Sequence, residues 1–411
     1  MKLKLLSVLF ACMACLWGQS ADAQCGSGPR YVDSLFTGST VTTVTYSSVY
    51  NLQMDVYQPT GDIATNRPLV ILAHGGSFTS GNRTDDATVV SLCQNLAKKG
   101  YVTASIEYRL TGNLNLLNGD SAINEVLEAV GDGKAAVRYF YKDVLTNGNV
   151  FNIDTNNIFL GGNSAGAVLF MHYAYVTDVN QLSSTFQAIL NNIGGGLEGI
   201  SGNAGYSSNF KGVINLAGAL NDASWINQCS KPLVSAQGTA DPIVPYNCGN
   251  PEYGAVPVTL CGLGAMAPYI TAHTSIYDTL TFPNAGHVPW QNGGVDFYMV
   301  DTLVTGFLNR AICAPTIPTC VVTPNGIKDV QFGASISLYP NPASSVLNIQ
   351  SSEFISDISM IDEMGRVVSQ ISDLHTLNYQ MNTSQLSAGV YFLRLNDNKG
   401  HIPAVRKVVI N

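Results

Sequence analysis

The chain has 411 residues, of which 46% are hydrophobic and only 12% charged, and its net charge is −8. At roughly 150 residues per domain, this length predicts two or three domains. The acidic balance argues against a nucleic-acid partner, because such a partner needs a basic face that displaces counterions from phosphates. Beyond the first residues, no stretch is apolar enough to span a bilayer.

The N-terminus predicts a secretory signal peptide over residues 1–23. Lys2 and Lys4 give a basic start, residues 5–17 are apolar, and Ala21-Asp22-Ala23 forms the small-x-small cleavage pattern before a mature start at Gln24. The alternative is a lipoprotein signal that ends at Cys12, where the preceding Phe10 is bulky for that recognition.

Export would bring the cysteines into an oxidising compartment. Seven cysteines follow the signal, which predicts up to three disulfides with one thiol left over. The favoured pairs are Cys248 with Cys261 and Cys313 with Cys320, because each closes a short loop. No Cys or His spacing resembles a zinc site.

From about residue 41 to residue 311, strands alternate with helices. Apolar runs separated by helical crossovers predict an α/β fold with a mostly parallel sheet covered on both faces. Residues 177–210 interrupt this rhythm with a Gly-, Asn- and Ser-rich stretch, and they form either a cap over a site or an irregular surface excursion. The expected strands are 69–73, 101–106, 157–162, 213–217, 233–236 and 275–282, and the expected helices are 84–99, 123–142 and 165–175.

The composition changes after Cys313. Residues 314–334 are rich in Pro and Thr and predict a linker, so residues 24–313 form one α/β domain. Residues 335–411 contain only short alternating runs between turns, with no helical period. This pattern predicts a small all-β sandwich.

A G-x-S-x-G pentapeptide lies at a junction between a strand and a helix. It reads Gly162-Asn163-Ser164-Ala165-Gly166. A serine becomes an exposed nucleophile on a sharp turn only when its neighbours are small, and the N-terminus of the following helix favours negative charge. The alternative is that Ser164 merely caps a helix in a nucleotide-binding type of fold.

The base and the acid of such a site follow the serine in the order Ser, acid, His. Only His287, of six histidines, follows the last strand of the sheet, whereas His172 lies in the helix after Ser164 and is expected to point away. Asp241 comes directly after the strand 233–236 and is the expected acid. Asp222 and Asp278 are less well placed.

The His74-Gly75-Gly76 turn predicts an oxyanion hole. Acyl transfer needs N–H donors aimed at the oxygen that becomes negative, and glycines leave those N–H groups unobstructed. Ala165 supplies one donor and Gly76 the other, with Gly75 or Ser77 as alternatives, while His74 braces the loop. The residues expected to contact substrate are Ser77, Phe78, Tyr246 and Trp290, although the three aromatic residues fit a core equally well.

These motifs resemble two known families. Residues from about 52 to 310 resemble the α/β-hydrolase esterases and lipases that carry His-Gly-Gly and Ser-Ala-Gly, with Asn163 and Ser77 departing from the commoner acidic residue and third glycine. The C-terminal residues resemble the type A sorting domain of the type IX secretion system. The matching pieces are Leu338-Tyr339-Pro340-Asn341-Pro342, Gly365, Ala388-Gly389-Val390-Tyr391 and Arg406-Lys407-Val408-Val409-Ile410.

The resemblance implies a secreted or surface-bound serine esterase of a Gram-negative bacterium, exported through the type IX machinery. It implies no metal or organic cofactor. Expected substrates are esters on a polysaccharide, a polyester or a short-chain lipid. The rival functions are an exopeptidase or amidase of the same fold, and a catalytically inactive adhesin.

Overall fold

A computed structural model describes residues 28–111, 118–227, 230–252, 255–314, 336–362, 366–396 and 404–411. The chain divides into two compact units, one up to Cys320 and one from Val321. The predicted signal peptide and almost all of the predicted linker lie outside the described residues, and so does Cys320 of one predicted disulfide. Within the described residues, no helix is long and apolar enough to cross a membrane.

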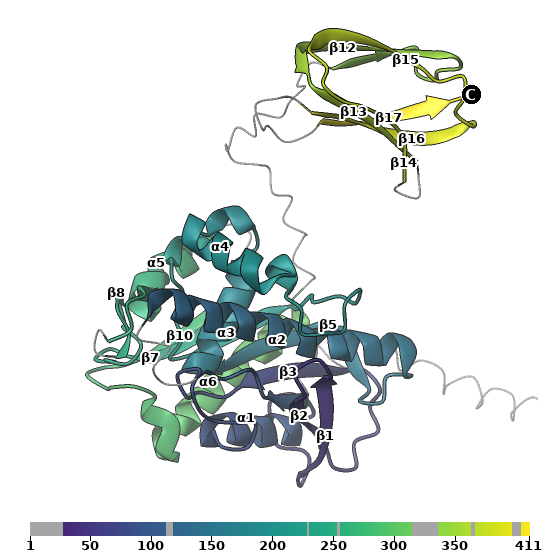
Figure 1. The fold of residues 1–411 in the computed structure, drawn as a ribbon. Coiled ribbons are helices and arrows are strands. Elements are labelled where there is room, and N and C mark those ends of the chain that lie inside the picture. The colour runs from purple at the N-terminus through teal and green to yellow at the C-terminus, as the bar shows by residue number, and fades with distance from the viewer. Residues whose placement is uncertain are drawn as a thin grey trace, which may run out of the picture. The chain divides into compact units, whose positions relative to one another are not determined.

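The first unit is built on an eight-stranded sheet with helices on both faces (Figure 1). Strands β3 to β7 and β10 pair in parallel, whereas β1 and β2 add an antiparallel edge, so the predicted α/β class is confirmed. In spatial order the strands are β1 (Ser39–Ser47), β2 (Leu52–Pro59), β4 (Val102–Ile106), β3 (Arg67–Ala73), β5 (Ile153–Asn163), β6 (Gly212–Leu216), β7 (Leu233–Gly238) and β10 (Tyr277–Phe282).

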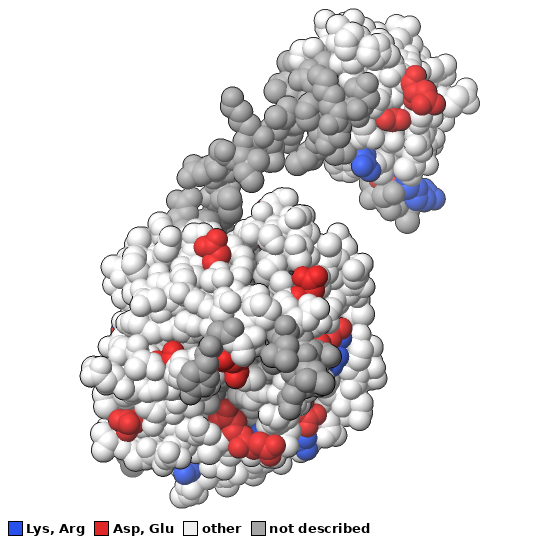
Figure 2. Space-filling model, turned by 60° about the vertical axis from the view of Figure 1, so that its left-hand side comes forward, with Lys and Arg blue, Asp and Glu red and all other residues white. Residues whose placement is uncertain are grey.

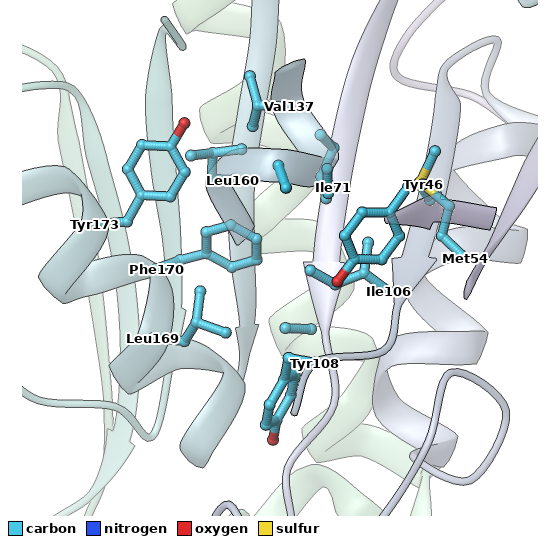
Figure 3. Close-up of a cluster of buried hydrophobic side chains, with 14 of the residues drawn as sticks. Tyr46, Met54, Ile71, Ile106, Tyr108, Val137, Leu160, Leu169, Phe170 and Tyr173 are labelled. Carbon is cyan, nitrogen blue, oxygen red and sulfur yellow. The ribbon is translucent and has the colours of Figure 1, made fainter. Parts of the chain in front are cut away.

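Alternate side chains of the central strands point into two different cores. Ile71 of β3 packs in one cluster with Phe170 and Val137, which come from the helices on one face. Its neighbours Val70 and Leu72 pack in a second cluster on the other face. Figure 3 shows the first cluster between the sheet and its helices. A strand buried on both faces must be apolar throughout, which explains the uninterrupted run in the sequence.

The described residues of the first unit contain six α-helices. Helices α2 and α3 contribute to the first cluster, and α1 and α6 contribute to the second. Helix α5 was not expected from the sequence, and neither was α6. The helices are α1 (Ala87–Lys98), α2 (Gly119–Thr146), α3 (Ala165–Tyr175), α4 (Ser184–Ile193), α5 (Leu263–His273) and α6 (Gly294–Cys313).

The insertion 177–210 contains helix α4. Leu190 of α4 is buried in a third apolar cluster. Ser201 is also buried, and its hydroxyl donates to Asp132 on α2, which Arg109 contacts as well. These contacts anchor the insertion to the domain.

Charged side chains are sparse on the surface. Figure 2 shows them as separate patches on a mostly uncharged face. This agrees with a composition of 28 acidic and 20 basic residues in 411.

The second unit consists of two antiparallel sheets, as predicted for residues 335–411. Their inner faces meet in one apolar cluster that includes Leu347, Met360 and Leu393. Strand β15 was not expected from the sequence. One sheet contains β11 (Ser337–Tyr339), β12 (Val346–Ile355) and β15 (Thr376–Asn382), and the other contains β14 (Val367–Ile371), β13 (Asp357–Asp362), β16 (Gly389–Asn396) and β17 (Ala404–Ile410).

Candidate active site

Ser164 lies on a sharp turn between β5 and α3. Its backbone has φ 54° and ψ −118°, a strained conformation for a residue with a side chain. The turn depends on its glycines: a Cβ on Gly166 would lie 2.1 Å from the carbonyl oxygen of Ala73, and one on Gly162 would lie 2.5 Å from the carbonyl carbon of Gly166. The small neighbours therefore let β3, β5 and α3 meet beside the serine, as the pentapeptide predicts.

His287 reaches Ser164 from a loop that follows β10. Its Nε2 lies 2.8 Å from the Ser164 Oγ, across 123 positions of sequence. The loop packs against the end of β7, because a Cβ on Gly238 would lie 2.2 Å from the carbonyl oxygen of Gly286. The N–H of Ala240 also donates to the carbonyl of Ala285 at 2.9 Å. Backbone contacts thus fix the imidazole relative to the sheet.

Asp241 orients this imidazole. Its Oδ2 lies 2.7 Å from the Nδ1 of His287, and its side chain is fully buried. The other oxygen, Oδ1, accepts the N–H groups of Ile243 at 2.9 Å and Val244 at 3.0 Å. A carboxylate held in this way keeps the proton on Nδ1, so that Nε2 can accept the proton of the serine hydroxyl.

The turn after β3 brings backbone N–H groups beside the serine. The N–H of Gly75 donates to the Asp86 carboxylate at 2.9 Å and is therefore committed elsewhere. Gly76 has φ +113°, and a Cβ there would lie 2.1 Å from the carbonyl oxygen of Ser80, so only glycine fits. Across the described ranges, the N–H groups of Gly76, Ser77 and Ala165 have no hydrogen-bond acceptor.

His74 stabilises this turn. Its ring stacks on Tyr108 with the centroids 4.4 Å apart, and its Nδ1 lies 2.6 Å from the carbonyl oxygen of Gly75. The hydroxyl of Tyr108 donates to the His74 carbonyl at 2.9 Å. Burial lowers the pKa of His74, which keeps the ring neutral. These contacts agree with a bracing role.

An apolar cavity opens beside Ser164. Its wall comes from the start of α2, from α3, from α4 through Phe186, and from Pro251, Glu252, Val256, Val258 and Leu260. Phe186 belongs to the insertion 177–210, so its place in the wall favours the interpretation of this insertion as a cap over a surface excursion. On the other side of the serine, a cleft has polar walls that include His287, Asp85 and Glu252.

Two of the four predicted substrate contacts line this cavity, namely Ser77 and Phe78. Tyr246 belongs to the wall of neither the cavity nor the polar cleft and packs against the third apolar cluster. Trp290 is fully buried in the core behind the site, where its Nε1 donates to the Asn163 side chain at 3.2 Å. For Trp290 the expected substrate contact is wrong and the core alternative is correct, whereas for the partly buried Tyr246 the substrate contact stays a prediction.

His172 lines the apolar cavity, so the expectation that it points away from the site is also wrong. Its Nδ1 lies 2.8 Å from the carbonyl oxygen of Val168, and its Nε2 accepts the N–H of Asn221 at 3.3 Å. Burial lowers the pKa of His172 to about 4. The ring is therefore a neutral part of the wall.

The loop 248–261 forms much of the cavity wall, and the sequence reading missed this role. A disulfide joins Cys248 to Cys261 at its two ends, which confirms one predicted pairing. Pro251, Glu252 and Val256 of this loop line the cavity. The signal that could have found them is the pair of cysteines that brackets a loop soon after Asp241.

Comparisons with known proteins agree on both units. The BD-FAE family model matches residues 54–195, and the model described as a secretion system C-terminal sorting domain matches residues 337–411. No curated protein is similar enough in sequence to count as a relative.

Solved structures similar to the chain include esterase 2 of Thermogutta terrifontis. The structure of this esterase phosphonylated by cyclosarin is 20% identical in sequence to the chain, with a TM-score of 0.50. The match covers 68% of this chain and 97% of the esterase. The structure phosphorylated by paraoxon is 21% identical, with a TM-score of 0.49, and the match again covers 68% of this chain and 97% of the esterase. At this identity the likeness of the cyclosarin adduct establishes a shared fold.

Proposed function

We propose that the chain is an exported serine carboxylic-ester hydrolase that forms an acyl-enzyme on Ser164, because the BD-FAE family model matches residues 54–195 and the model of a secretion system C-terminal sorting domain matches residues 337–411. The observation that carries this proposal is the continuous set of contacts from Asp241 through His287 to Ser164, at 2.7 and 2.8 Å. Both contacts lie within the reach required of an acid, a base and a nucleophile.

The proposed reaction has two steps. His287 takes the hydroxyl proton of Ser164 as Oγ attacks the ester carbonyl. The resulting oxyanion accepts hydrogen bonds from the N–H groups of Gly76 and Ala165. Collapse breaks the bond to the alcohol, which leaves with the proton from His287. Water then attacks the acyl-enzyme while His287 takes one of its protons, and as the bond between the acyl carbon and Oγ breaks, His287 returns that proton to Oγ, which regenerates Ser164 and releases the carboxylic acid.

The walls on the two sides of Ser164 support a particular class of substrate. The cavity wall is almost entirely apolar, which suits an aliphatic or aromatic group on one side of the ester bond. The opposite cleft has polar and acidic walls, which suit a hydroxyl-rich alcohol. An ester carried by a polysaccharide combines both properties and is the substrate that we favour over a polyester or a lipid.

The sorting domain implies export to the cell surface or the medium. We propose that the host is a Gram-negative bacterium whose type IX machinery recognises the second unit. The residues before 24, which carry the predicted signal peptide, would direct the first membrane crossing.

The test uses the exported protein with p-nitrophenyl acetate, butyrate and octanoate, alongside amino-acid nitroanilides. We expect turnover of the esters and its loss in Ser164→Ala. Ester turnover that survives this substitution would contradict the mechanism. Cleavage of the nitroanilides alone would favour the peptidase alternative, and turnover of neither class would favour the inactive adhesin.

A further inference from the structure

Asp86 occupies an unusual position next to the proposed site. Its Oδ1 accepts the N–H groups of Thr88 at 3.0 Å and Val89 at 3.2 Å, which caps the N-terminus of α1. Its Oδ2 accepts two further donors, the N–H of Gly75 at 2.9 Å and the side-chain amide of Asn163 at 3.0 Å. One carboxylate therefore joins a helix, the turn after β3 and the residue that precedes Ser164.

The connection continues to the loop of His287. The side-chain oxygen of Asn163 accepts the Nε1 of Trp290 at 3.2 Å, and Trp290 comes three positions after His287. Trp290 is fully buried, so its position is fixed by the core. Asp86 and Asn163 thus link the three loops that carry the oxyanion donors, the nucleophile and the base.

We propose that Asp86 is a positioning residue, which holds the N–H of Gly76 at the correct place relative to Ser164. The proposal rests on the proposed ester hydrolysis. Asp86 acts through Gly75: anchoring the N–H of Gly75 on Oδ2 fixes this residue, and the next peptide unit carries the N–H of Gly76. Gly75 itself is packed between partners, because a Cβ there would lie 3.3 Å from both the Asp86 Oδ2 and the Ser164 Cβ.

The physical reason is that oxyanion stabilisation tolerates only small errors in the position of the N–H donor. A donor contributes fully only when it lies within hydrogen-bonding distance of the oxygen in the transition state, and an error of about 1 Å costs on the order of 100-fold in rate. A loop with three consecutive residues at positive φ, as Gly76, Ser77 and Phe78 have, needs outside contacts to keep such accuracy.

The decisive variant is Asp86→Ser in the full exported chain. A serine remains a good helix cap but has no second oxygen for Gly75 and Asn163. We expect kcat for p-nitrophenyl butyrate to fall by roughly 10- to 100-fold, with KM within about twofold of the wild-type value. Asp86→Ala should show the same fall in kcat together with a lower melting temperature, because it also loses the cap.

Asp154→Ser is the matched control. The Oδ1 of Asp154 accepts the N–H of Asn156 at 2.9 Å and its Oδ2 accepts the Asn157 side chain at 2.6 Å, so the substitution removes the same kind of contacts. Asp154 lies at the start of β5, and Ser164 follows its end, about 30 Å away at the usual rise per residue. We expect kcat of this control to equal that of the wild type.

The outcomes separate the two proposals. If the wild type shows no Ser164-dependent ester turnover, the proposed function fails. If it does show that turnover, and Asp86→Ser retains wild-type kcat, the positioning role of Asp86 is overturned. The role is also overturned if kcat of Asp86→Ser falls but Asp154→Ser shows the same fall. The same holds if kcat of Asp86→Ser falls only together with its melting temperature.

Discussion

The hydroxyl of Ser77 donates to the Oε1 of Glu252 at 2.5 Å, across 175 positions of sequence. This hydrogen bond ties the turn that carries the proposed oxyanion donors to the loop between Cys248 and Cys261. Glu252 lines both the apolar cavity and the polar cleft, so the bond lies where the two meet beside the serine. The shape of the cavity therefore depends on how this loop is held.

Removing the disulfide should loosen the cavity wall. For Cys248→Ala with Cys261→Ala, we expect KM for p-nitrophenyl octanoate to rise several-fold more than KM for the acetate, because the longer chain needs the wall. We also expect a loss of about 3 kcal/mol in the free energy of unfolding, from the extra entropy of the opened loop. Steady-state kinetics and urea unfolding measure both. An unchanged ratio of the two KM values would contradict the role of the loop.

Filling the cavity should shorten the preferred acyl chain. Val168 is buried in the cavity wall on α3, one turn after Ser164. Val168→Phe should lower kcat/KM for octanoate at least about tenfold relative to acetate. The larger side chain fills part of the cavity, so the longer acyl chain loses contacts that stabilise it. Val168→Ala is the matched variant and should move the ratio the opposite way. A parallel loss on all chain lengths in both variants would argue that the chain does not enter this cavity.

The acid should matter for turnover more than for binding. Asp241→Asn presents an amide to the imidazole and stabilises the wrong tautomer, so kcat for butyrate should fall by about 10⁴-fold with little change in KM. Asp278→Asn serves as the control, because Asp278 lies in β10 and pairs with Arg310 away from the site. Equal activities of the two variants would remove Asp241 from the mechanism.

The buried His172 predicts a pH-dependent stability. Burial lowers its pKa to about 4 in the folded protein, whereas the unfolded chain has the ordinary value near 6.5. Between these values only the unfolded chain binds the proton, so the free energy of unfolding falls as the pH drops from about 6.5 to about 4, by about 3 kcal/mol in total. His172→Gln should reduce this fall, which urea unfolding at pH 7 and pH 4.5 measures. Identical falls in both proteins would contradict it.

Much of the architecture follows from the sequence because its signals are local. An apolar run such as that of β3 predicts a strand with both faces buried, and α3 begins and ends at the predicted residues, 165 and 175. The G-x-S-x-G turn is similarly local, since the need for Gly162 and Gly166 arises from atoms within a few residues and from the adjoining strand.

The walls of the site could not be predicted in this way. Trp290 and Phe78 are both buried aromatic residues near the pentapeptide, yet only Phe78 also lines the cavity. Long-range contacts decide between them, and local sequence contains no record of those contacts. Helix α5 was missed for a related reason, because its apolar residues are not confined to one face and it contains Pro268, a residue that normally argues against a helix.

The proposed reactive atoms and part of the cavity wall belong to different parts of the chain. Ser164, Asp241 and His287 follow strands of the sheet, whereas Phe186 and the 248–261 loop are additions outside it. Substitutions in these wall segments can therefore adapt the cavity to a new ester without changing the arrangement of Ser164, Asp241 and His287. For an engineer, that loop is the place for a mutational library, and the glycines around the nucleophile are the positions to leave alone.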